Sequence, residues 1–147
     1  MQRRDFVKLI SGAFALAFIA PVNAFSAIWN KAAFETTKLN EAEKGLEING
    51  EKLSQDILIT VPDKAENGAI VQVEVKSDIP NTKTISILVE KNPTPLIAHF
   101  KFSNGAEPFV VTRIKMAETS DVKVVVKAGN QYFTNAKNVV VLENGCG

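Results

Sequence analysis

Eight short segments rich in Val, Ile and Phe constrain the fold of this chain more than any other feature of its sequence. They cover residues 56–61, 69–76, 84–90, 96–103, 109–116, 121–128, 131–135 and 138–142. Apolar and polar residues alternate in several of them, as in VQVEVK at residues 71–76. A period of two residues in segments of this length and composition predicts β-strands.

Turn-forming sequences separate the segments, among them AENG, DIPN, NPTP, SNGAEP and AGN. Seven or eight short strands without alternating helices predict an all-β fold, an immunoglobulin-like antiparallel β-sandwich. The chain has a single cysteine, so no disulfide can bridge the two sheets. Packing alone must hold them, and each fully buried Val, Ile or Phe contributes about 1.5–3 kcal/mol.

One helix is expected before the strands, over residues 30–46. This stretch is rich in Ala, Glu and Lys, and its apolar residues recur loosely at helical spacing. Gly45, with EING after Leu46, supplies a stop signal. We find no internal repeat or linker, so residues 25–142 are expected to form one sandwich domain that begins with a short helix.

The first 24 residues have the pattern of a twin-arginine export signal. Arg3 and Arg4 precede an apolar run over residues 9–20, and Val22 and Ala24 fit a cleavage site after Ala24. A membrane anchor is the alternative, but a span needs roughly 20 apolar residues and this run is shorter. We therefore expect a periplasmic protein that is exported already folded, with no membrane association.

The composition argues against several classes of partner and cofactor. The 17 Lys and Arg residues are scattered singly, which does not favour nucleic-acid binding. His99, Cys146 and, after signal cleavage, Met116 are single residues of their types, too few for a zinc, haem or iron–sulfur site. No acidic loop has calcium-ligand spacing, so neither a metal nor a cofactor is expected. A partner chain that folds onto this one then remains as a reason for folded export.

No catalytic residue is expected. His99 alternates with the polar residues of its segment, which predicts a solvated imidazole. The acids of the turns, Glu107, Glu118 and Asp121, are expected to be solvated, and the aromatic residues Trp29 and Tyr132 to pack against the protein.

The tail at residues 143–147, ENGCG, carries the cysteine. Gly145 and Gly147 have no Cβ, so the chain beside Cys146 is thin and free in its φ angle. The residues after Leu142 allow Cys146 to reach roughly 13–14 Å from the sandwich. Glu143 and the terminal carboxylate disfavour the thiolate. This pattern predicts a flexible arm whose thiol is presented to the active sites of other proteins.

The chain resembles the SoxY family, the sulfur carriers of the periplasmic Sox thiosulfate-oxidation system. The resemblance lies in AENGAIVQVEV, ILVEKNPTPLIAHF, GAEPFVVTRIKMAETSDVKVVVK and the terminal cysteine. It implies that Cys146 is the site of covalent substrate attachment, and that Asn144, Gly145 and Gly147 form a swinging arm. In the family this arm reads Gly-Gly-Cys-Gly-Gly, so Asn144 is a departure.

The same resemblance implies the partners. These are a SoxZ-like subunit without its own export signal, which forms a heterodimer with the carrier, and transient client enzymes. A haem enzyme attaches thiosulfate, a manganese hydrolase releases sulfate, and a molybdenum enzyme, where one is present, oxidises the remaining sulfur. The carrier itself is expected to catalyse nothing.

Two other classes of protein remain open from the residues alone. A secreted structural or adhesive β-sandwich subunit could carry Cys146 as an adventitious or disulfide-forming residue. A thiol-redox enzyme would more naturally contain a Cys-X-X-Cys pair, which this chain lacks.

Overall fold

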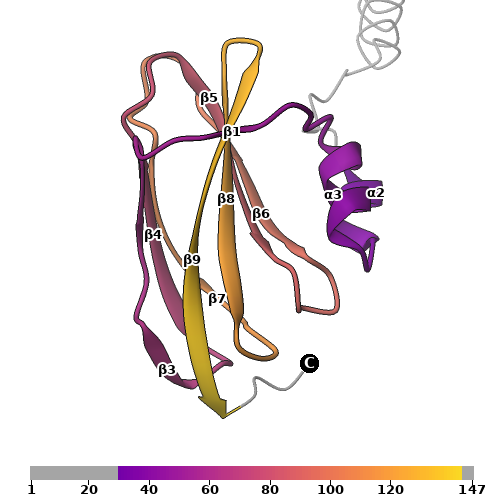
Figure 1. The fold of residues 1–147 in the computed structure, drawn as a ribbon. Helices are drawn as coiled ribbons and strands as arrows, with labels where there is room; N and C mark the ends of the chain where they lie inside the picture. Colours follow the sequence, from indigo (N-terminus) through magenta and orange to yellow (C-terminus); the bar gives the residue numbers. More distant parts are fainter. Residues whose placement is uncertain (1–29, 144–147) are drawn as a thin grey trace, which may run out of the picture.

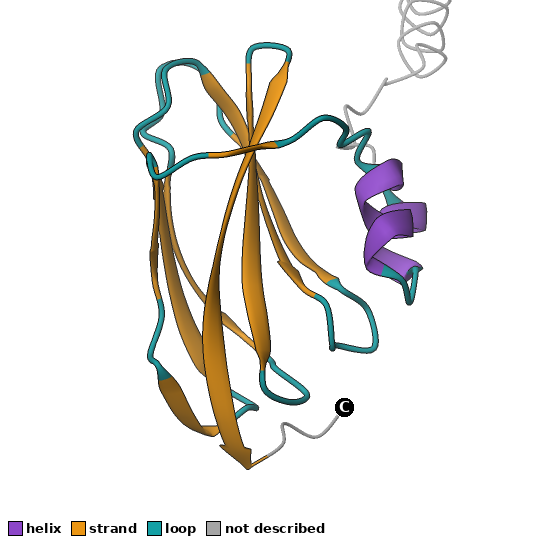
Figure 2. Cartoon of the chain, in the orientation of Figure 1, coloured by secondary structure: helices purple, strands orange, loops and turns teal. Residues whose placement is uncertain are grey.

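A computed structural model describes residues 30–143, and residues 1–29 and 144–147 lie outside the description. Figures 1 and 2 show two short helices beside a β-sandwich. The elements in chain order are α2 (Lys31–Glu35), α3 (Leu39–Gly45), β1 (Lys52–Leu53), β2 (Ile57–Thr60), β3 (Lys64–Asn67), β4 (Val71–Ser77), β5 (Thr82–Val89), β6 (Leu96–Lys101), β7 (Phe109–Ile114), β8 (Ser120–Ala128) and β9 (Gln131–Glu143).

The strands form two sheets that pack face to face. Sheet A has the order β1-β9-β8-β5-β6, and β3 also pairs with β9; sheet B has the order β2-β4-β7. Most neighbours are antiparallel, but β1 and β3 pair with β9 in parallel. The immunoglobulin-like β-sandwich expected from the sequence is confirmed.

The main core lies between the two sheets. Its fully buried members come from both layers, with Val73 and Val75 on β4 of sheet B and Ile85 and Ile87 on β5 of sheet A. These residues stand two apart on their strands, so the alternation in the sequence corresponds to the inward face of each sheet.

The other face of sheet A is covered by the two helices. A second cluster combines Ala33 and Ala42 of the helices with Leu88, Val125 and Tyr132 of the sheet. Because sheet A is covered on both faces, β5 is buried continuously over residues 85–89 and β8 over residues 124–126. These runs therefore do not alternate as the strands of sheet B do.

Strand β9 is longer than the sequence suggested. The segments 131–135 and 138–142 were expected as two strands, but they form one strand of 13 residues. It pairs with β8 without interruption from Gln131 to Val139. Gly129, with φ of +59°, closes the hairpin between the two strands, a backbone angle that favours glycine.

The single helix expected over residues 30–46 is wrong. The chain leaves the helical conformation at Thr36, which has extended backbone angles. The Thr36 hydroxyl accepts the backbone N–H of Lys38 at 3.3 Å and donates to the Glu41 carboxylate at 2.7 Å. A threonine that bonds the local backbone in this way favours a turn over a continuing helix. The expected stop at Gly45 is correct, since α3 ends there.

The break lets the two helices fold back on each other at a close contact. A Cβ added to Gly45 would lie 2.9 Å from the Ala33 Cβ and 3.1 Å from its Cα. The Asn30 side chain caps α2 by accepting from Ala33 N–H and donates to the Gly45 carbonyl at 2.6 Å. Gly45 is thus required by the packing of α2 on α3.

A partly buried ion cluster fastens the helical segment to sheet A. The Lys123 ammonium on β8 lies 2.7 Å from a Glu43 carboxylate oxygen and 2.6 Å from a Glu51 carboxylate oxygen. Burial by itself lowers the pKa of Lys123, but the hydrogen bonds and charges of Glu43 and Glu51 outweigh it and raise this pKa. The lysine is therefore fully charged at neutral pH and holds α3 and the start of β1 together.

Replacing Gly45 by Ala is expected to lower the free energy of unfolding. Alanine gains up to about 1 kcal/mol of helix propensity, but overpacking against the Ala33 backbone costs about 1–3 kcal/mol. Asn40→Ala, on the exposed side of α3, is the matched control and should raise stability by about 0.5 kcal/mol. Urea unfolding of both variants measures the difference, and an equal gain in both would contradict the close contact.

Candidate functional site

The strand that leads to the cysteine is held by the sandwich along its whole length. At its end β9 pairs with β3, with Ala65 opposite Val141 and Asn67 opposite Glu143. The Gly68 N–H donates to the Glu143 carbonyl at 2.9 Å. Figure 1 shows β9 ending beside β3, at the end of the sandwich opposite the β8–β9 hairpin. The backbone is therefore fixed up to Glu143, one residue beyond the expected boundary at Leu142.

The site residues expected from the sequence are Cys146, Asn144, Gly145 and Gly147. All four lie outside the described residues. The structure thus locates the point from which the expected arm departs, and the assignment of these four residues stays a prediction. The expected signal segment and Trp29 lie outside the described residues as well.

His99 is not the solvated residue that the sequence suggested. It is partly buried on β6 beneath the helices, and its Nδ1 atom lies 2.9 Å from the Ser86 hydroxyl on β5. The two residues are direct cross-strand partners. Alternation on β6 correctly put His99 and Lys101 on one face, but this face of sheet A is covered by α2 and α3.

The bond to Ser86 favours one tautomer of the imidazole. Ser86 is almost fully buried, and among the described residues His99 Nδ1 is its hydroxyl's one hydrogen-bonding partner. A buried hydroxyl without an acceptor is costly, which favours Ser86 as the donor to Nδ1 and the ring proton on Nε2. Burial, and then the charge of Lys101, lower the pKa of His99. The neutral imidazole is therefore the form present at pH 7.

Two observations weigh against Ser86 and His99 as a catalytic pair. The Ser86 side chain is almost fully buried, and no described residue bonds the second ring nitrogen of His99 to orient the imidazole. Within residues 30–143 no His, Cys, Asp or Glu cluster could hold a metal ion. The acids considered from the sequence behave as surface groups: Glu118 lies 3.8 Å from Lys91, and Asp121 accepts from Asn138 at 2.8 Å.

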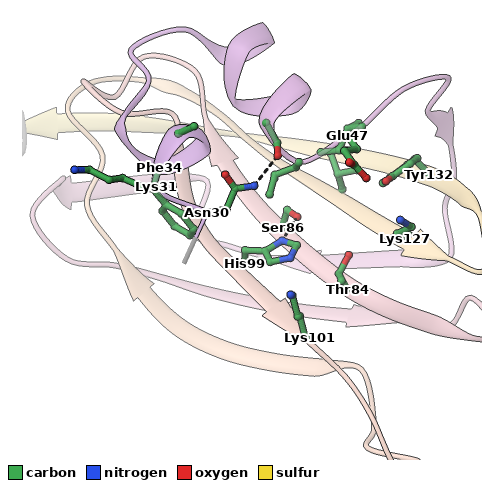
Figure 3. Close-up of a pocket in the computed structure, with 15 residues that line it drawn as sticks. Asn30, Lys31, Phe34, Glu47, Thr84, Ser86, His99, Lys101, Lys127 and Tyr132 are labelled. Atoms are coloured by element: carbon green, nitrogen blue, oxygen red, sulfur yellow. Dashed lines mark hydrogen bonds between the residues drawn. The ribbon is translucent and has the colours of Figure 1, made fainter. Parts of the chain in front are cut away.

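A cavity that the sequence did not reveal lies between the helices and sheet A (Figure 3). It has a volume of about 890 Å³, and Ser86 and His99 form part of its wall. Lys101, Thr84 and Lys127 also line it. These three residues belong to three adjacent strands and form one cross-strand row of the sheet. They are far apart in the sequence, so the sequence alone did not reveal that they are neighbours.

The fold and the fixed end of β9 define a class, a small all-β sandwich whose last strand is held up to Glu143 at one end. Comparison with known families narrows this class. Residues 47–146 match the model of the family described as sulfur oxidation protein SoxY. This chain belongs to the SoxY family.

A solved structure supports the same conclusion. The sulfur carrier protein SoxY from Chlorobium limicola f thiosulfatophilum is 35% identical, with a TM-score of 0.65, and the match covers 71% of this chain and 96% of that one. The superoxide reductase (neelaredoxin) from Ignicoccus hospitalis has a TM-score of 0.53 over 59% of this chain and 80% of its own. At 19% identity that likeness shows the sandwich fold alone. Comparison with curated proteins gives no match.

The described helices are too short to cross a membrane. Both together span fewer residues than the roughly 20 that one crossing needs.

The protonation of His99 can be tested directly, because the chain has one histidine. In an NMR titration, the imidazole of the folded protein should have a pKa below 6.5, and that of the urea-unfolded chain a pKa near 6.5. The neutral form is favoured on folding, so this contribution to stability is complete above pH 6.5 and is lost as pH falls from 6.5 toward the lower folded pKa. His99→Gln should remove that part of the pH dependence. A folded pKa at or above 6.5 would contradict the buried arrangement.

Proposed function

We propose that this chain is a periplasmic sulfur carrier that holds thiosulfate-derived intermediates on Cys146. The observation that carries the proposal is the extent of the family match, which runs from residue 47 through Cys146 itself. The related Chlorobium limicola protein is described as a sulfur carrier. The carrier supplies the attachment point and leaves catalysis to its client enzymes.

The proposed loading step is an oxidation. The Cys146 thiol and thiosulfate form a new S–S bond, giving Cys–S–S–SO₃⁻, one proton and two electrons, and the electrons pass to a haem-containing enzyme. Hydrolysis by a manganese enzyme then adds water across the bond to the sulfonate group. Sulfate leaves, two protons are released, and a persulfide, Cys–S–S⁻, stays on the carrier for oxidation by a molybdenum enzyme where one is present.

The end of β9 supports a short tether. Glu143 is the last residue held by the sandwich, and three residue steps span at most roughly 10–11 Å to Cys146. This is shorter than the 13–14 Å expected from Leu142. A thiol on so short a tether can enter a channel of a client enzyme only if the end of the sandwich docks against the mouth of that channel. The tether raises the local concentration of the intermediate at each enzyme.

Replacing Cys146 by Ser is expected to abolish loading without loss of stability, because a residue beyond the last strand contributes little packing. Intact mass spectrometry after incubation with thiosulfate and the haem enzyme measures loading, and thermal unfolding measures stability. Ala136→Ser, at an exposed position of β9, is the control and should load normally. Loading of the Cys146→Ser protein would overturn the assignment.

We further propose that the chain is exported as a heterodimer with a SoxZ-like subunit. The outer face of sheet B supports this. Phe109 and Val111 on β7 are 43% and 54% exposed, and Leu58 on β2 is 48% exposed. The cross-strand rows place Leu58 and Phe109 on either side of Lys76. Exposed apolar side chains gathered on one face with charged neighbours are typical of a protein–protein contact.

The heterodimer should bury about 1,200–2,000 Å² of total surface and survive purification from periplasm. Val111→Arg should reduce the amount of co-purified partner, because it places a charge in the contact. Leu53→Arg changes an apolar residue of sheet A that is still more exposed, at 73%, and should leave the yield of partner unchanged. A monomer in the unmodified protein, or equal losses in both variants, would count against this surface.

A further inference from the structure

The cavity beneath the helices has an apolar side and a side rich in hydrogen-bond donors. Phe34, Ile48, Val125 and Tyr132 contribute the apolar surface. Figure 3 shows Thr84, His99, Lys101 and Lys127 projecting from the sheet toward the same space. The carrier function proposed above uses none of these groups.

The donors are neighbours because of the strand register. Thr84 on β5 is the direct partner of Lys101 on β6 and of Lys127 on β8. The row therefore reads Lys101, Thr84, Lys127 across three adjacent strands. With strands about 4.8 Å apart, the two lysines start roughly 10 Å from each other with a hydroxyl between them. His99 stands in the next row, beside Ser86.

Positive charge in this row is not neutralised within the described residues. No carboxylate lies within 4.0 Å of the Lys101 or Lys127 ammonium, although Lys127 lies 5.2 Å from the centre of the Tyr132 ring. The third lysine of the cavity wall, Lys31, is paired with Glu35 at 3.7 Å. Glu47 is the one carboxylate among the lining residues, so the cavity carries a net positive charge.

Two neutral donors point into the same region. The Thr84 hydroxyl makes no hydrogen bond to any other described residue. In the tautomer that the Ser86 bond favours, the proton is on Nε2 of His99, and this atom has no hydrogen-bonding partner among the described residues. The row and its neighbour thus supply four hydrogen-bond donors: two ammonium groups, a hydroxyl and an imidazole N–H. None of these groups is a strong acceptor, and a site with such a set of donors is suited to bind an oxyanion.

We propose that this cavity binds a small organic anion, with a carboxylate or sulfonate head at Lys101, Thr84 and Lys127 and an apolar body against Phe34, Ile48 and Tyr132. The size favours an organic ligand over an inorganic ion. A volume of about 890 Å³ lies within the range of roughly 300–1,000 Å³ found for sites that bind molecules of drug size. An inorganic ion would leave the apolar surface uncovered.

The site is independent of the carrier cysteine. Tyr132 and Glu143 lie near opposite ends of β9, and at about 3.3 Å per residue the strand separates them by roughly 35 Å. A tether of roughly 10–11 Å cannot bring Cys146 of the same molecule to the cavity. The ligand is therefore bound without covalent attachment, and failure of either proposal leaves the other intact.

Binding of 2-naphthalenesulfonate to the full mature chain tests the proposal, with sulfate as a probe of the head alone and 2-naphthalenemethanol as a probe of the body alone. Calorimetry gives the affinity, and the single imidazole of His99 reports the location by NMR. We expect the sulfonate to bind at least tenfold more tightly than either other probe and to shift the His99 signal.

Lys101→Gln and Lys127→Gln should each weaken binding of the sulfonate several-fold, and together at least tenfold. Lys83→Gln is the matched control, because Lys83 is exposed on β5 beside Thr84 and does not line the cavity. It should leave the affinity unchanged. Absence of binding, equal affinity for sulfate or for the alcohol, an unchanged His99 signal, or an equal loss in Lys83→Gln would each overturn the proposal.

Discussion

The backbone pairing of strand β9 is the constraint on which the rest of the structure depends. Its thirteen residues pair with β8 on one edge and with β1 and β3 on the other. The segment between the helices and sheet B is fixed to the sandwich through β1, and the start of β4 is positioned through β3. The same ladder holds the chain up to Glu143, the last described residue. In the proposed carrier function, this fixed end would support the tether that presents the Cys146 thiol.

Sheet A is covered on both faces, and the cavity described above lies on one of them. One face packs against sheet B, and the other receives α2 and α3 through Leu88 and Val125. The helical segment also faces the row of Lys101, Thr84 and Lys127, but a cavity separates the two there. The helices pack over the part that contains Leu88 and the Lys123 cluster, and the row of Lys101, Thr84 and Lys127 remains beside an open cavity. The proposed ligand site thus lies where the helical segment and sheet A do not pack directly on each other.

Local patterns predicted the elements better than they predicted their surroundings. Alternation in residues 71–76 identified β4 correctly because sheet B has one buried and one exposed face. The same rule put the His99 side chain on the polar face of β6, and this placement is correct. The expectation that His99 is solvated there is wrong, because the helices cover this face and His99 bonds to Ser86. The break at Thr36 was missed because Ala, Glu and Lys on both sides favour helix, while a side-chain bond to Lys38 N–H favours the turn. The spacing of apolar residues along the sequence does not predict such side-chain bonds to the backbone.

By itself the sequence determined the all-β class, the approximate strand segments, the stop of the helix at Gly45 and the likeness to SoxY. These depend on residue period, turn chemistry and motifs, which are local properties of the chain. Tertiary structure decided which strands are neighbours, and so it alone brought Lys101, Thr84 and Lys127 into one row and placed Glu43 and Glu51 on Lys123. The physical reason is that strand register and helix docking are set by the burial of residues far apart in the chain. No local pattern records which distant residue will complete a contact.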